Sequence, residues 1–448
     1  MGKLFGTDGI RGVANQYPMT PEMALAVGRA AASYFKSESS MRVVIGKDTR
    51  QSGDMLECAL ATGISSMGVD ACLTGVMPTP GIARITAQIG ACAGIVVSAS
   101  HNPYEDNGIK VFDGNGYKLL ESSEQALEKQ ILDYLDAPAA GHSIGRCDAI
   151  MDAQEYYEEF LISSVPGMSL KGLRIVLDCS NGATFQTAPH VFSRLGADVS
   201  VLADKPDGVN INAGCGSQYP EALKKAVITH NAHAGFAFDG DGDRVIAVDE
   251  TGKVLTGDQA LAICAIHMKQ SGRLTDSHVV GTVMSNMGLK TALKKHGIRL
   301  SLANVGDRYV MEMMKSKGAM LGGEDSGHTI FLDRHTTGDG ILSALQLLEA
   351  MQSAAKPLSA LSEIMTVFPQ ILINIPVKVQ PDIDTIPTIR NMVKEVQDRL
   401  GDEGRVLIRY SGTQPLCRVM VEGPSVEATR TGAEDIAAAV RVAIGQIK

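Results

Sequence analysis

The feature that most constrains the fold of this 448-residue chain is one pattern that occurs three times. An apolar, β-branched run of the kind that forms a buried strand is followed by a polar turn and then by a segment with helical periodicity. These runs lie at residues 41–48, 173–178 and 279–283. Strands that alternate with helices build parallel βαβ crossovers. We therefore expect an α/β protein with three related domains, each with a mixed, largely parallel sheet.

The last part of the chain has a different order of elements. Residues 371–378, 405–410 and 416–422 have the pattern of strands, whereas 385–400 and 426–444 have that of helices. The resulting β-α-β-β-α order favours a small C-terminal α+β domain with an antiparallel sheet.

Composition narrows the range of partners. The net charge is −9, there is no Trp, and only 4% of the residues are aromatic. These values disfavour a nucleic-acid or anionic-membrane partner, and no apolar run is long enough to span a bilayer. The eight cysteines form no C-x-x-C pair. We expect reduced, mostly buried thiols in a cytoplasmic protein that binds a small anionic metabolite.

The sharpest local signal is the acidic segment DGDGDR at residues 239–244, which follows the apolar run AGFAF. Asp239, Asp241 and Asp243 alternate with glycines, so the backbone can curl until three carboxylates converge on one cation. Hard oxygen ligands of this kind suit Mg²⁺. A solvated turn is one alternative. An EF-hand is another, because Glu250 has the right spacing, but its turn glycine is replaced by Arg244 and its flanks are strand-like.

A second signal is the serine loop SASHNP, which ends a strand pattern at residues 93–98. Sites in open α/β sheets lie beyond the carboxyl ends of strands. Ser100 is thus placed as an accessible nucleophile or phosphoryl carrier, with His101 beside it and Lys110 able to return toward it. Ordinary turn chemistry is the alternative. The segment 141–145 fits G-x-S-x-G, but no strand pattern precedes it, which argues against a serine hydrolase.

Two further loops have the chemistry of sugar and phosphate binding. In GGEDSGH, Glu324, Ser326 and His328 would share one face of an extended loop, whereas a tight turn would separate them. In RYSGTQPLCR, Arg409 and Arg418 flank hydroxyl and glycine residues, which together favour an anion cradle over a plain hairpin.

In chain order, these motifs and the N-terminal FGTDGIRG resemble the α-D-phosphohexomutase superfamily over the whole chain. NINAGCGS at residues 210–217 and SGT in the last loop resemble the bacterial branch that acts on glucosamine phosphates. Three positions depart from the pattern of relatives, with Tyr410 in place of Pro, Gln414 in place of Glu and Asp325 in place of Gln.

The resemblance implies four domains around a central cleft. Their expected bounds are 1–150 with the phosphoserine loop, 151–253 with the metal loop, 254–367 with the sugar loop, and 368–448 with the phosphate-binding loop.

The resemblance also implies roles for individual residues. One Mg²⁺ would be held by Ser100, Asp239, Asp241 and Asp243. The catalytic group would be Ser100, His101, Lys110, Arg11 and Arg244. The substrate-binding group would be Thr7, Gly9, Glu324, Ser326, His328, Arg409, Ser411, Gly412, Thr413 and Arg418.

The implied reaction converts glucosamine 6-phosphate to the 1-phosphate through phospho-Ser100 and glucosamine 1,6-bisphosphate, which also primes the enzyme. It would feed UDP-N-acetylglucosamine synthesis for peptidoglycan precursors. A glucose or mannose phosphate substrate is the nearest alternative, and a non-catalytic sugar-phosphate or Ca²⁺-binding protein is another. Oligomeric state stays open, with a homodimer as one option.

Overall fold

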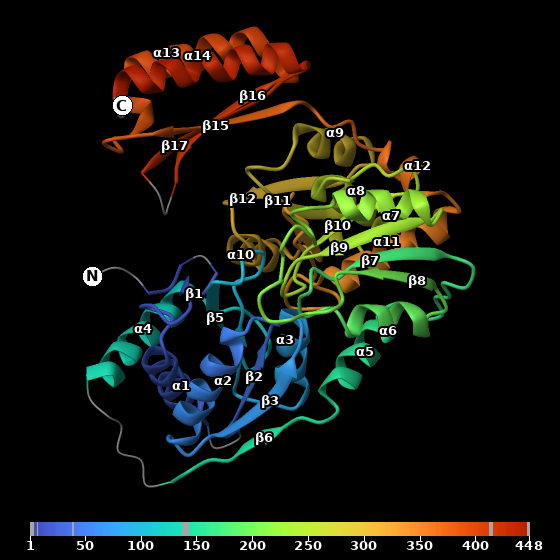
Figure 1. Cartoon of the computed structure of the whole chain (residues 1–448). Coiled ribbons are helices and arrows are strands. Elements are labelled where there is room, and N and C mark those ends of the chain that lie inside the picture. Colours follow the sequence, from blue (N-terminus) through green and yellow to red (C-terminus); the bar gives the residue numbers. More distant parts are fainter. Residues whose placement is uncertain (1–3, 7, 38–39, 137–142, 412–414, 446–448) are drawn as a thin grey trace. The chain divides into compact units, whose positions relative to one another are not determined.

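A computed structural model describes residues 4–6, 8–37, 40–136, 143–411 and 415–445 (Figure 1). The chain forms two compact units. The first comprises Met1–Met284 and His296–Ile364, and the second comprises Ser285–Lys295 and Met365–Lys448.

The first sheet of the first unit has six strands in the order β1-β5-β4-β2-β3-β6. β2 pairs in parallel with β3 and β4, and β4 pairs antiparallel with β5. The strands are β1 (Ile10–Val13), β2 (Arg42–Lys47), β3 (Asp70–Val76), β4 (Ala93–Val97), β5 (Asp106–Asp113) and β6 (Cys147–Ala149). The helices are α1 (Pro21–Phe35), α2 (Ser52–Ser65), α3 (Thr79–Gln88) and α4 (Glu121–Asp136).

The second and third sheets have four strands each, in the orders β10-β9-β7-β8 and β12-β11-β13-β14. The strands are β7 (Arg174–Asp178), β8 (Asp198–Leu202), β9 (Ala234–Phe238), β10 (Val245–Asp249), β11 (His278–Thr282), β12 (Arg299–Ala303), β13 (Leu321–Gly323) and β14 (Thr329–Phe331). The helices of these parts within the first unit are α5 (Ala153–Ser163), α6 (Thr187–Arg194), α7 (Glu221–Thr229), α8 (Gly257–Gln270), α10 (Asp307–Lys317), α11 (Gly340–Ala354) and α12 (Leu358–Ser362), with a 3₁₀ turn at Thr275–Ser277.

One strand order is common to all three sheets. β5-β4-β2-β3, β10-β9-β7-β8 and β14-β13-β11-β12 each place the first strand of the repeat between two parallel neighbours. The fourth strand then pairs antiparallel with the third. The prediction of three related α/β domains with mixed, largely parallel sheets is therefore confirmed.

Burial explains why the third strands form as they do. β4 (AGIVV) and β9 (AGFAF) are buried at every position, as expected for strands covered on both faces. These two strands carry no polar side chain, so polar side chains appear only in the loops that follow them.

The second unit has a three-stranded antiparallel sheet in the order β15-β17-β16. Val419 and Val421 of the central strand pack in one core with Ile436 and Val440, and α13 and α14 lie on one face of this sheet (Figure 1). The predicted C-terminal α+β domain is confirmed. Its elements are β15 (Gln370–Pro376), α13 (Pro387–Leu400), β16 (Arg405–Tyr410), β17 (Leu416–Glu422) and α14 (Val426–Ile444), with 3₁₀ turns at Ile383–Thr385 and Gly401–Glu403; α9 (Met287–Lys295) also belongs to this unit.

The cysteines are all free thiols, but they are not mostly buried. Only Cys179, Cys264 and Cys417 are buried, while Cys58 and Cys147 are exposed. The expectation failed because a cysteine within an apolar run can still face outward on a helix or an edge strand. In the described part of the chain, no helix is long and apolar enough to cross a membrane.

Candidate active site

Three of the predicted loops occupy the same place in the three repeats. The serine loop connects β4 to β5, the acidic loop connects β9 to β10, and the loop with Glu324 connects β13 to β14. Each loop therefore follows the third strand of its repeat, at the carboxyl end where ligands bind in α/β sheets.

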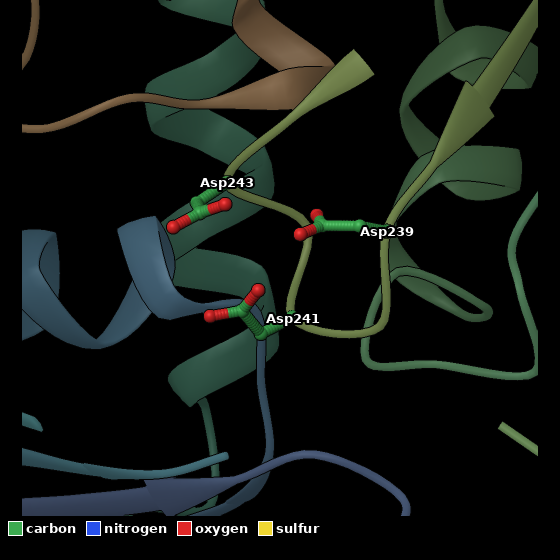
Figure 2. Close-up of side chains that lie close together, drawn as sticks. All are labelled: Asp239, Asp241 and Asp243. Carbon is green, nitrogen blue, oxygen red and sulfur yellow. The ribbon is translucent and has the colours of Figure 1, made fainter. Parts of the chain in front are cut away.

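The acidic loop brings its three carboxylates around one small space (Figure 2). Asp239, Asp241 and Asp243 are buried, and each offers an oxygen within 4.8 Å of the others. Gly242 adopts a φ of +72°, which lets the loop turn. Asp241 Oδ1 and Asp243 Oδ1 are buried and accept no hydrogen bond in the described part of the chain. Open, buried carboxylate oxygens fit a hard cation such as Mg²⁺.

Ser100 faces this acidic loop. Its Oγ donates a hydrogen bond to Asp239 Oδ2 over 2.6 Å and lies 3.5 Å from His101 Nδ1. The expectation that this hydroxyl would be accessible is wrong, because Ser100 is fully buried. The cause is the bond to Asp239, which turns the side chain inward. An added phosphoryl group must displace that bond.

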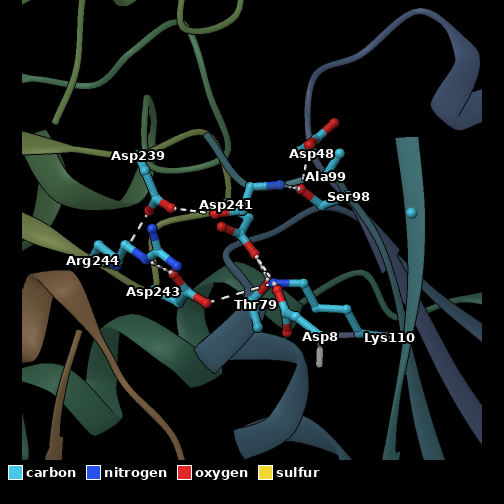
Figure 3. A network of polar contacts seen from close by, with 12 residues as sticks. Asp8, Asp48, Thr79, Ser98, Ala99, Lys110, Asp239, Asp241, Asp243 and Arg244 are labelled. Carbon is cyan, nitrogen blue, oxygen red and sulfur yellow. Dashed lines mark hydrogen bonds and ion pairs between the residues drawn. The ribbon is translucent and has the colours of Figure 1, made fainter. Parts of the chain in front are cut away.

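Lys110 approaches the acidic loop from β5 (Figure 3). Its Nζ lies 2.7 Å from Asp241 Oδ2, 3.1 Å from Asp8 Oδ2 and 3.5 Å from Asp243 Oδ2. Burial alone would lower the pKa of Lys110, but these three carboxylates raise it above its usual range. The amine is therefore held as a buried cation among acidic groups.

The pKa values of two carboxylates of this loop, Asp239 and Asp243, are shifted in opposite directions. Burial, together with the charges of Asp243 and Asp241, raises the pKa of Asp239 well above its usual value. Burial would also raise the pKa of Asp243, but Lys110 and His328 outweigh it and hold the pKa low.

The other predicted catalytic groups surround Ser100. Arg244 Nη1 lies 3.2 Å from His101 Nδ1, and Arg11 Nη1 donates to Ala99 O over 3.3 Å. Burial and the nearby Arg244 and Arg11 charges lower the pKa of His101 to about 4, so the imidazole is neutral at pH 7. Gly9 lies so close to β5 that a Cβ would be 2.4 Å from Ile109 O.

The loop after β13 forms a turn, so its three predicted side chains do not share a face. Gly327 N donates to Glu324 O over 3.0 Å, and Gly327 has a φ of +89°. Ser326 is exposed, whereas His328 is buried with Nδ1 3.7 Å from Asp243 Oδ2. Glu324 Oε1 accepts from Gly306 N. The left-handed glycine reverses the chain, which an extended loop would not.

In the second unit, Arg409 and Arg418 are paired residues on β16 and β17. Burial, then the charge of Arg418, lowers the pKa of Arg409. Two cations held side by side favour an anion near them. Ser411 is buried directly after β16. Thr7, Gly412 and Thr413 lie outside the described residues.

Two of the three departures from the superfamily pattern have local structural partners, and the third, Gln414, lies outside the described residues. Asp325 Oδ1 accepts from Asp258 N over 3.1 Å, which caps the first turn of α8. Tyr410 donates its hydroxyl to Pro381 O over 2.8 Å.

The EF-hand alternative is excluded by the flanking strands and by Glu250, whose carboxylate accepts from Ser359 and not from the loop. The G-x-S-x-G segment includes Gly141 and His142, which lie outside the described residues.

Sequence reasoning missed several residues that hold this site together. Asp8 accepts from Arg11, and it pairs with Lys110 and with Lys118, which also bonds Asp307. Thr79 Oγ1 donates to Asp241 Oδ2 over 2.5 Å. Asp8 lies within the FGTDGIRG motif, so that motif could have indicated it. Thr79 and Asp307 belong to no motif, and only the fold brings them to the site.

Family models match the chain in four segments. They are phosphoglucomutase/phosphomannomutase α/β/α domain I at residues 2–137, domain II at 154–252, domain III at 256–368, and the C-terminal domain at 372–439.

Whole-chain comparisons agree with these matches. Proteins named phosphoglucosamine mutase from Syntrophus aciditrophicus and Syntrophobacter fumaroxidans are each 56% identical over 99% of this chain and 100% of their own length. A phosphoglucomutase/phosphomannomutase family protein from Burkholderia thailandensis has a similar structure, with a TM-score of 0.81, 25% identity and 97% of each chain covered. Aspergillus fumigatus N-acetylphosphoglucosamine mutase, solved with GlcNAc-6P and magnesium, shares the fold with a TM-score of 0.71, 18% identity, and 99% and 96% of the chains covered.

Proposed function

The chain belongs to the phosphoglucomutase/phosphomannomutase family of isomerase-class enzymes, and from that premise we propose that it interconverts glucosamine 6-phosphate and glucosamine 1-phosphate with Ser100 as phosphoryl carrier. The observation that carries the proposal is the Ser100 hydroxyl, 2.6 Å from Asp239 at the edge of three buried carboxylates. The names of the most similar relatives support the amino-sugar substrate.

The reaction moves one phosphoryl group twice. The P–Oγ bond of phospho-Ser100 breaks as a P–O bond forms to O1 of the sugar; O1 loses its proton and Oγ gains one. The resulting glucosamine 1,6-bisphosphate turns over, and its O6 phosphoryl returns to Oγ, which loses its proton as O6 gains one. Such transfers depend mainly on positioning and charge stabilisation. Glucosamine 1,6-bisphosphate from solution would also phosphorylate a bare Ser100.

Each group of residues has one task. Lys110 acts as the general acid and base and balances charge. Arg11, His101 and Arg244 lie around the transferred phosphoryl group. Asp239, Asp241, Asp243 and Ser100 would hold one Mg²⁺, which would withdraw charge from the phosphoryl oxygens.

Substrate recognition belongs to three other groups of residues. Thr7, Gly9 and His328 would contact the substrate, and Glu324 and Ser326 would bind the sugar hydroxyls. Arg409, Ser411, Gly412, Thr413 and Arg418 would grip the phosphate that does not react. We propose bounds of 1–150, 151–253, 254–367 and 368–448 for the four domains. We also propose that the enzyme acts in the cytoplasm and supplies UDP-N-acetylglucosamine synthesis.

Replacing Ser100 tests the carrier. Ser100→Ala should abolish turnover and remove the mass of one phosphoryl group from the chain after incubation with the bisphosphate. Ser180→Ala is a matched control, because Ser180 also has a φ of +54° just beyond the end of a strand, while the only hydrogen-bond partner of its Oγ among the described residues is Cys179 O. Ser180→Ala should keep wild-type turnover within a few-fold. Normal turnover by folded Ser100→Ala would end the proposal.

The substrate is tested separately from the carrier. Wild-type enzyme should turn over glucosamine 6-phosphate faster than glucose 6-phosphate or mannose 6-phosphate. The opposite order would replace the amino-sugar assignment with the alternative phosphoglucomutase/phosphomannomutase activity, and the carrier would stand.

A further inference from the structure

Arg50 is buried beneath the serine loop, at the carboxyl end of β2. Its guanidinium donates to three backbone carbonyls of that loop and to one at the start of β5. Nη2 reaches Ser100 O over 3.0 Å and Asn102 O over 2.8 Å. Nη1 reaches Asp106 O over 3.0 Å and also Pro103 O.

The remaining donor of Arg50 is fixed by Asp48. Nε donates to Asp48 Oδ2 over 2.9 Å, and neither side chain is exposed. Asp48 Oδ2 also accepts from Ser98 Oγ, which in turn accepts from Ser100 N over 3.0 Å. Both the amide and the carbonyl of Ser100 are therefore tied to the Asp48–Arg50 pair.

A second side chain holds the same carbonyls from the second repeat. Asn212, within NINAGCGS, donates from Nδ2 to Ser100 O over 2.9 Å and to Asn102 O over 3.1 Å. Gly240 of the acidic loop lies against this junction, where a Cβ would be 2.6 Å from Ser100 O. The carbonyl of Ser100 is thus fixed relative to the loop that carries Asp239.

The conformation of Ser100 shows what this clamp must do. Its φ of +54° lies in the left-handed region, which is sterically unfavourable for a serine. With its amide and carbonyl fixed, the Cα–Cβ bond has one direction, and Oγ comes within reach of Asp239. A free loop would relax and move that oxygen away.

We propose that Arg50 and Asn212 are positioning residues that hold the backbone of Ser100 so that its Oγ faces the acidic loop. The proposal rests on Ser100 as the phosphoryl carrier, but neither side chain is required to touch substrate. Lysine cannot replace Arg50, because an ammonium group is a point donor and cannot span four carbonyls in the plane of a guanidinium.

The test uses Arg50→Lys and Asn212→Asp in the full chain. Each should lower kcat for glucosamine 6-phosphate at least about tenfold and change KM less than about threefold, since small misplacements slow a reaction strongly. Both variants should still gain one phosphoryl group by intact mass when incubated with glucosamine 1,6-bisphosphate, and should release more of it as inorganic phosphate per turnover.

Arg273→Lys is the matched control. Arg273 is also a largely buried arginine with several partners, Asp333 and Gln346 among them, but it does not contact the serine loop. This variant should keep kcat within about twofold of wild type. Wild-type kcat in both Arg50→Lys and Asn212→Asp, or a loss confined to KM, would overturn the positioning role.

The result for the positioning variants can be distinguished from the result of the Ser100→Ala test. If Arg50→Lys does not fold, Asn212→Asp decides the question alone, because it keeps the size of the side chain. If Ser100→Ala is inactive while both positioning variants are fully active, the clamp is wrong and the carrier stands.

Discussion

Asp339 is a buried carboxyl at the start of α11, outside the proposed catalytic group. It accepts from Leu342 N over 2.9 Å, which caps the helix, and from Tyr157 Oη over 2.9 Å. Burial raises its pKa to about 7. A carboxyl of this kind makes stability depend on pH in a definite direction.

The sign follows from proton counts. The unfolded chain loses this proton near pH 4, whereas the folded chain keeps it until about pH 7. Between these values the folded state binds more protons, so raising the pH lowers the free energy of unfolding, by up to about 4 kcal/mol. Asp339→Asn keeps the cap acceptor and should remove this part of the decline. Urea denaturation of both proteins from pH 4 to pH 8 measures it, and parallel pH profiles would contradict it.

At the scale of single residues, the sequence predicted best the side chains that cluster along the chain. Asp239, Asp241 and Asp243 are close in space because a glycine-rich loop brings near neighbours together. Thr79 and Asn212 could not be placed in this way. Each contacts a loop more than a hundred positions away, Asp241 and Ser100 respectively, and only the packing of one repeat on another creates those contacts.

At the scale of elements, the repeat was predictable but the equivalence of the loops was not. The apolar runs of β2, β7 and β11 are long enough to mark the first strand of each repeat. β13 and β14 have three residues each, too few to establish a period, so the third copy of the strand pair could not be aligned from sequence. The sequence left the turn at Gly327 open as an alternative to an extended loop, for the same reason.

A close helix crossing offers a prediction at this scale. A Cβ on Gly63 of α2 would lie 2.3 Å from Leu25 O of α1. Gly63→Ala should therefore lower the free energy of unfolding by about 2 kcal/mol, because the two backbones must separate. Gly53→Ala on the same helix is the control, since the nearest atom to its Cβ would be in the Lys47 side chain, 3.2 Å away, and the nearest backbone atom, Asp48 O, would be 3.8 Å away. Equal stability of the two variants in urea denaturation would contradict this crossing.

At the scale of the whole molecule, the two units carry different parts of the proposed chemistry. The first unit contains Ser100 and the acidic loop, and the second contains the Arg409–Arg418 pair. The sequence predicted the C-terminal α+β part of the second unit, because the change in the order of elements is visible without coordinates, but it assigned α9 to the third α/β domain.

If the second unit binds the phosphate that does not react, a substitution in that unit should affect KM selectively. Arg409→Ala should raise KM for glucosamine 6-phosphate at least about tenfold, which corresponds to about 1.4 kcal/mol of lost binding, with little change in thermal stability. Arg430→Ala, an exposed arginine of the same unit, is the control and should leave KM unchanged. An unaltered KM in Arg409→Ala would remove this residue from the substrate site.

The central claim is that the phosphoryl group on Ser100 passes directly to the sugar. Enzyme phosphorylated on Ser100 should be mixed with one equivalent of glucosamine 6-phosphate and quenched at short times. The account predicts that phospho-Ser100 disappears as glucosamine 1,6-bisphosphate appears, in equal amounts and at least as fast as steady-state turnover. Phosphate that stays on Ser100 during turnover, or leaves it only as inorganic phosphate, would contradict the account.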